Sequence, residues 1–166
     1  MRRIFLITLL FSFLSSSASY ILIPMDEKQK NHLKAYGISF FVLQKDIKVD
    51  WLLNYRGGSF LMKFYKDFEN ECIIRNVTYE VIADIQANQI LSSISQPEIN
   101  QDVIRLEKEP RVAIYSPKNK QPWDDAVTLA LSYAEIPYDI IYDEEVLNDL
   151  LVTYDWLHLH HEDFTG

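Results

Sequence analysis

The C-terminal end of the 166-residue sequence holds its densest group of chemically capable side chains. Three of the four histidines, His158, His160 and His161, stand there beside the carboxylates of Glu162 and Asp163. Neutral imidazole and carboxylate groups bind divalent metals such as zinc, and they also act as general acids and bases. The sequence therefore places a candidate ligand or metal site at His160, His161, Glu162 and Asp163, with no catalytic role assigned to any of them.

The spacing of these residues leaves two interpretations open. Side chains alternate along a strand, so His158 and His160 lie on one side and His161 on the other unless the chain turns after His160. In the second interpretation, the imidazoles hydrogen-bond the ends of neighbouring strands and the carboxylates cap a following helix. The sequence contains no His-Glu-x-x-His spacing, which is typical of a zinc site on a helix.

Two further residues have weaker functional signals. Arg56 precedes Gly57-Gly58-Ser59 at a predicted strand end, where it can bind a carboxylate ligand or simply form part of a turn. Cys72 is the only cysteine, which excludes an intramolecular disulfide. Its place in a predicted helix favours a buried, inert thiol. No other cofactor signal is evident, because the four glycines form no nucleotide-binding loop.

The second half of the chain is predicted to position the histidine cluster. Short apolar runs predict strands at 112–115, 138–142 and 154–160, and a stripe of apolar residues with helical spacing predicts a helix over 123–134. A short helix over 143–150 completes a βαβαβ order with parallel strands. Ligands bind at the carboxyl ends of such strands, where loops 116–121, 143–145 and 161–166 are expected to meet.

The N-terminus indicates export. Arg2 and Arg3 precede an apolar run over 4–14 and small residues at 15–19, which predicts a signal peptide over 1–19. The run is shorter than the roughly 20 residues of a membrane-spanning helix, so we expect no stable span after cleavage. Cleavage removes two positive charges and no acids, so the formal charge changes from −8 to −10. Such a charge disfavours nucleic acid as a partner.

The remaining composition predicts two folded units. An N-terminal α/β unit over 20–95 is followed by a polar linker over 96–110 and a second α/β unit over 111–166. The predicted fold class is α/β, with three layers and a mostly parallel sheet. The second unit would be an incomplete flavodoxin-like βαβαβ arrangement.

Several blocks of the sequence resemble a family of exported bacterial proteins commonly labelled asparagine synthetase B. The blocks are 20–26, 30–37, 54–60, 121–127 and 155–166. The resemblance implies that the chain is an N-terminal fragment, because family members continue past Gly166. Its second half resembles the start of a class I glutamine amidotransferase-like domain, whose nucleophile would follow Gly166. The catalytic motifs of asparagine synthetases are not matched: Arg2 stands where their cysteine would be, and Gly57-Gly58-Ser59 lacks the flanking residues of their pyrophosphate loop.

These observations lead to one expectation and two alternatives. We expect a protein of the periplasm or cell envelope of a Gram-negative-type bacterium, which binds or hydrolytically processes a small polar molecule at the strand carboxyl edge. The first alternative is a glutamine-dependent amidotransferase or ligase, as the family label implies. The second is a non-catalytic envelope interaction module. The sequence does not indicate an oligomeric state.

If the C-terminal cluster binds a divalent metal, zinc added to the purified protein raises its melting temperature. The variant with both His160→Ala and His161→Ala should lose this increase, because two imidazole ligands are gone. Differential scanning calorimetry measures both proteins. A parent protein whose melting temperature is unchanged by zinc contradicts the metal interpretation.

Overall fold

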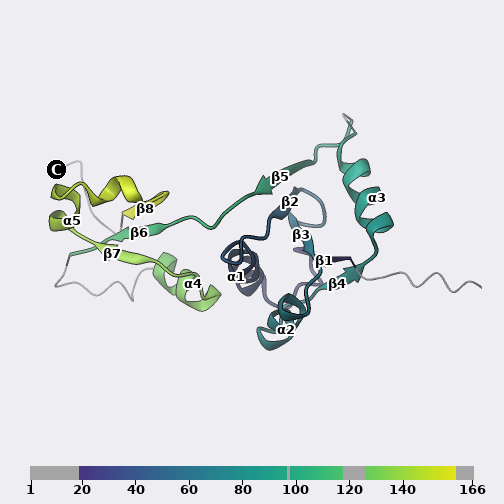
Figure 1. Ribbon diagram of the computed structural model, residues 1–166, viewed down its shortest axis with the longest axis horizontal. Helices are drawn as coiled ribbons and strands as arrows, with labels where there is room; N and C mark the ends of the chain where they lie inside the picture. Colours follow the sequence, from purple (N-terminus) through teal and green to yellow (C-terminus); the bar gives the residue numbers. More distant parts are fainter. Residues whose placement is uncertain (1–18, 97, 118–125, 160–166) are drawn as a thin grey trace, which may run out of the picture.

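Two sheets organise the chain, which a computed structural model describes over residues 19–96, 98–117 and 126–159 (Figure 1). The N-terminal unit contains β1 (Tyr20–Ile23), α1 (His32–Leu43), β2 (Val49–Leu53), β3 (Ser59–Lys63), α2 (Lys66–Ile74), β4 (Glu80–Ile82), α3 (Asp84–Ile94) and β5 (Asp102–Leu106). The second unit contains β6 (Val112–Tyr115), α4 (Ala126–Ala134), β7 (Asp139–Ile141), α5 (Asp143–Leu147), the 3-10 helix η2 (Leu150–Thr153) and β8 (Trp156–Leu159). The mixed α/β class predicted from the sequence is confirmed.

The five-stranded sheet of the N-terminal unit has the order β4-β1-β3-β2-β5, and all its neighbouring strands are antiparallel. The prediction of a mostly parallel sheet is therefore not confirmed. The cause is the short β2–β3 connection, which allows only a hairpin and hence antiparallel strands. Asn54, Arg56, Gly57 and Gly58 adopt positive φ angles in this turn. The sequence patterns do not predict β3, and β5 lies inside the segment 96–110 that was predicted as a linker.

Helices cover both faces of this antiparallel sheet. Strand side chains alternate between the faces, so Ile21 and Ile23 of β1 pack with α1 and α2, while Leu22 packs with α3. Phe60 and Leu61 of β3 divide between the two faces in the same way. The strands are apolar on both sides because each side is buried beneath a helix.

The second unit follows the predicted βαβαβ order. β6 lies at the centre of the order β7-β6-β8 and pairs with both neighbours in parallel. Leu131 of α4 packs against Val112 and Ile114, so α4 covers that face of the sheet. The resemblance to a flavodoxin-like domain stays a prediction. Across the described ranges, none of the helices has the length and apolarity needed to cross a bilayer. The predicted signal peptide lies almost wholly outside them.

The two units meet where α1 packs against α4 (Figure 1). A methyl group added to Gly37 would lie 1.8 Å from the carbonyl oxygen of Ala134. The two helices can approach this closely only because position 37 has no side chain. A glycine in the middle of an isolated helix lowers the stability of that helix. The contact between the two units explains why position 37 is nevertheless a glycine.

Polar contacts surround this close approach. The Asn31 side-chain amide donates a hydrogen bond to the Tyr133 hydroxyl at 2.8 Å. The Glu135 carboxylate forms ion pairs with Lys34 of α1 and, at 3.2 Å, with Arg75 that follows α2. The hydrogen bond from Lys34 is the main cause that lowers the pKa of Glu135. These contacts orient the second unit on the first.

Replacement of Gly37 by alanine is expected to lower the free energy of unfolding by about 1–3 kcal/mol, because the new methyl group overpacks the contact with Ala134. Urea denaturation measures the change. Ser92→Ala, at an exposed position within α3, is the matched control and should change stability by less than about 0.5 kcal/mol. Alanine favours an isolated helix over glycine by about 1 kcal/mol, so a more stable Gly37→Ala protein contradicts the close approach.

Candidate functional site

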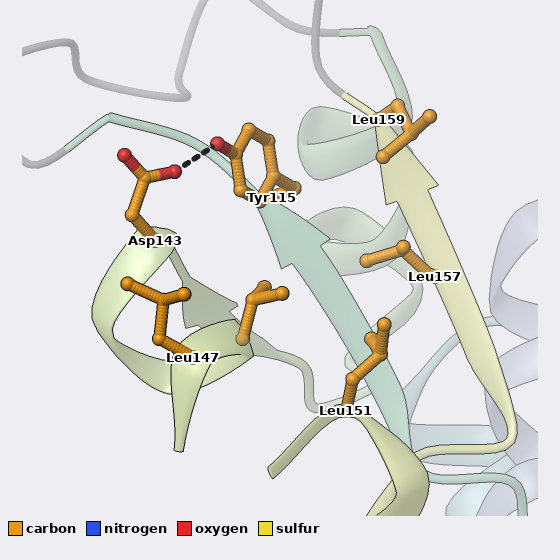
Figure 2. Close-up of a pocket in the computed structure, with 7 residues that line it drawn as sticks. Tyr115, Asp143, Leu147, Leu151, Leu157 and Leu159 are labelled. Atoms are coloured by element: carbon orange, nitrogen blue, oxygen red, sulfur yellow. Dashed lines mark hydrogen bonds between the residues drawn. The ribbon is translucent and has the colours of Figure 1, made fainter. Parts of the chain in front are cut away.

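A pocket of about 440 Å³ opens at the carboxyl edge of the parallel sheet (Figure 2). Tyr115 and Leu159 are the last residues of β6 and β8. Asp143 is the first residue of α5, which follows β7 after Tyr142. The lining residues are Tyr115, Asp143, Val146, Leu147, Leu151, Leu157 and Leu159. The pocket thus lies where ligands bind in open α/β sheets.

Strand alternation explains which side chains reach this pocket. Tyr115 is in register with Leu159, and Leu157 is two positions earlier on β8, so all three point to one face. Figure 2 shows the labelled side chains of β6 and β8 on the side of the sheet occupied by α5 and η2. α4 covers the opposite face. The pocket is therefore the incompletely covered second face of the parallel sheet.

One polar pair interrupts the apolar lining. The Tyr115 hydroxyl donates a hydrogen bond to Oδ1 of Asp143 (Figure 2). Asp143 lies in the first turn of α5, where the helix dipole favours a negative charge. Within the described ranges, Oδ2 of Asp143 has no hydrogen-bond partner, so this oxygen can accept one from a ligand.

The rim of the pocket exposes large apolar side chains. Leu147 is 82% exposed and Leu159 is 48% exposed. Val152, directly after the pocket-lining Leu151, is 86% exposed. Exposed large apolar side chains such as Leu147 and Leu159 beside a pocket are typical of a binding site for a ligand or another macromolecule.

The histidine cluster predicted from the sequence is not placed by the structure. His160, His161, Glu162 and Asp163 lie outside the described residues, so their role as a ligand or metal site stays a prediction. His158 is described and, by strand alternation, lies on the face opposite Leu157 and Leu159. The described ranges contain no group of three or more His, Cys, Asp or Glu side chains that could hold a metal ion.

Sequence reasoning located the edge but missed most of the pocket. Of the predicted loops, 143–145 contributes Asp143. The sequence predicts Tyr115 only as part of a buried strand. Its position at the carboxyl end of that strand could have indicated a residue of the ligand site. Leu147 and Leu151 lie on two separate helices, α5 and η2, so the four-residue spacing between them was not a usable signal.

Arg56, the secondary candidate, connects three segments of the N-terminal unit. Its Nε donates to Oδ2 of Asp26 and its Nη1 donates to Oε1 of Glu80, both at 2.8 Å. Nη2 is buried and has no hydrogen-bond partner among the described residues. The guanidinium is thus already paired with two carboxylates of the protein itself. A carboxylate ligand would have to compete with both of them.

Cys72 is a core residue of the N-terminal unit. The side chain is completely buried, and this burial raises the pKa of the thiol to about 12. Thiolates, not thiols, act as nucleophiles. Cys72 therefore remains protonated and unreactive at neutral pH.

The Arg56–Asp26 pair predicts how stability depends on pH. The hydrogen bond from Arg56 lowers the pKa of Asp26 below its usual 3.8. The pair therefore stabilises the fold fully above pH 3.8, and this stabilisation is lost as the pH falls through the lowered pKa. Asp26→Asn should lower the melting temperature at pH 5–7, and the difference from the parent should shrink below about pH 3.8.

Thermal unfolding followed by circular dichroism between pH 7 and pH 2 measures this difference. Asp67→Asn is the matched control, because Asp67 is an exposed carboxylate on α2 that forms no ion pair within the described ranges. Its difference from the parent should stay small across that range. A difference for Asp26→Asn that is the same at every pH contradicts the assigned role of the pair.

Comparison of the chain with models of known protein families, with curated proteins and with solved structures found no match. The resemblance to the exported family thus stays a prediction.

Proposed function

We propose that the chain binds a small amphiphilic molecule in the pocket at the carboxyl edge of the parallel sheet. The observation that carries this proposal is the Tyr115–Asp143 pair at the edge of a pocket whose other lining residues are all aliphatic. The ligand would place its apolar body against the leucines and its polar group at Asp143 (Figure 2).

The apolar walls support a ligand that is hydrophobic along most of its length. Five of the seven lining residues are leucine or valine side chains. Removal of apolar surface from water contributes about 25 cal/mol per Å², so a ligand that covers these walls gains affinity mainly from this burial. The small polar ligand expected from the sequence would leave the walls uncovered, and an amphiphile would not.

The polar pair supports a hydrogen-bond donor as the head group. The Tyr115 hydroxyl already gives its hydrogen to Oδ1 of Asp143, and the ionised carboxylate of Asp143 can only accept hydrogen bonds. A carboxylate oxygen forms its strongest hydrogen bonds with a charged donor such as an ammonium group. The formal charge of −8 on the whole chain also attracts cations.

We propose an exported binding protein, and the export rests on the N-terminal sequence alone. Hydrolytic processing and glutamine-dependent ligation both remain proposals, and each needs a nucleophile. Cys72, the only cysteine, is buried and protonated, so it supports neither of them. An interaction module is compatible with the exposed apolar rim. The polar pair at the pocket edge favours a small ligand.

Octylammonium and nonanoate have the same alkyl chain and opposite head-group charge, so the difference between their affinities isolates the contribution of the head group. In isothermal titration calorimetry, octylammonium is expected to bind about tenfold more tightly than nonanoate, because only the ammonium group donates to Asp143. Asp143→Asn should remove this preference. Leu147→Ser, at the exposed rim, should weaken the binding of both ligands because it removes apolar contact area.

Asp67→Asn again serves as the control, since it removes the same charge from α2, outside the pocket, and should leave both affinities unchanged. The proposal is wrong if neither amphiphile binds to the parent protein. It is also wrong if both bind equally well and Asp143→Asn has no effect.

A further inference from the structure

We infer a second binding site, for a neutral polyhydroxylated ligand such as a monosaccharide, between α3 and the sheet of the N-terminal unit. A pocket of about 370 Å³ lies there, within the range of known small-molecule sites. It is lined by Leu22, Tyr55, Glu80, Ile82, Gln86, Gln89, Ile90 and Ser93. This site is independent of the pocket in the second unit.

The pocket has an apolar floor and a polar rim. Leu22 and Ile82 are buried in the sheet and, with Ile90 of α3, belong to the core cluster on this face. The ring of Tyr55 packs against the same cluster. A pyranose ring has a similarly divided surface, with C–H groups on its faces and hydroxyls around its edge, so the two surfaces are complementary.

α3 presents a stripe of uncharged polar side chains to the pocket. Gln86, Gln89 and Ser93 follow at i, i+3 and i+7, the spacing of one helix face. Asp84 is the only charged residue in the helix, although charged residues make up 24% of the sequence. A solvent-facing helix surface usually carries charged residues. Side-chain amides and hydroxyls can both donate hydrogen bonds to neutral hydroxyl groups and accept hydrogen bonds from them.

Several hydrogen-bonding groups on this rim are available to a ligand. Oε1 of Gln86 accepts from the Ala83 amide at 3.0 Å, which leaves the side-chain NH2 as a donor. Oε1 of Glu80 accepts from Arg56, which leaves Oε2 as an acceptor. Within the described ranges, the Tyr55 hydroxyl and the Gln89 side-chain amide have no hydrogen-bond partner. Neighbouring donors and acceptors of this kind can pair with adjacent hydroxyls on one sugar.

The charge balance of the rim favours a neutral ligand over an ion. Glu80 is the only charged lining residue, and its carboxylate is already paired with the Arg56 guanidinium at 2.8 Å. A cation would compete with Arg56 for Glu80. An anion would be repelled by the Glu80 carboxylate and by Asp26, which is paired with the same guanidinium.

Saturation-transfer difference NMR with D-glucose, D-galactose and N-acetyl-D-glucosamine tests the inference. At least one of these sugars should bind with a Kd of about 1 mM or lower. The double variant with Tyr55→Phe and Gln89→Ala should bind that sugar about tenfold more weakly, because it loses two hydrogen-bonding groups and keeps the aromatic ring. Asn88→Ala, exposed on another side of α3, is the control and should leave the affinity unchanged.

The inference is overturned if none of the three sugars gives a saturable signal with the parent protein. It is also overturned if the double variant and Asn88→Ala bind as tightly as the parent. An acetylated trialanine amide is titrated in parallel, because amide side chains also pair with peptide groups. Binding of this peptide, without sugar binding, would replace the sugar site by a peptide site. Octylammonium binding should be the same in all these variants, which separates the two sites.

Discussion

The rule that a parallel sheet buries both its faces shapes the whole second unit. α4 covers the face of β6 that carries Val112 and Ile114. α5 and η2 cover the other face only in part, and the pocket is the space that they leave beside Tyr115 and Leu157. A ligand that covers the remaining apolar surface of this face is therefore stabilised by its burial. The pocket and its affinity for apolar groups therefore have one physical origin.

The N-terminal unit supports this arrangement through the close packing of α1 against α4. Gly37 lets α1 approach the backbone of Ala134 at the end of α4, and Glu135 then binds cations from both α1 and the end of α2. The loop before β7 is held by the same contact, since it directly follows Glu135. The antiparallel sheet is thus a base that fixes the position of α4 and, through it, one face of the parallel sheet.

The sequence predicted the second unit better than the first, for physical reasons. Its strands are short apolar runs, and its helix has a clear apolar stripe, so local patterns were sufficient. In the first unit, Gly57 and Gly58 indicate a turn, but the positive φ angles of Asn54 and Arg56, which fold the chain back into a hairpin, are not visible in the sequence. Without that reversal of the chain, β3 and the pairing of β5 could not be foreseen. The Tyr115–Asp143 pair joins residues 28 positions apart and depends on the strand register.

We propose that the uncovered face of the parallel sheet is a ligand site in which Asp143 binds the head group. A crystal structure of the protein with octylammonium would test this proposal. We expect the ammonium nitrogen within hydrogen-bond distance of the Asp143 carboxylate and the alkyl chain against Leu157 and Leu159. Octylammonium bound elsewhere on the protein, with this pocket empty or filled by the protein's own side chains, would contradict it.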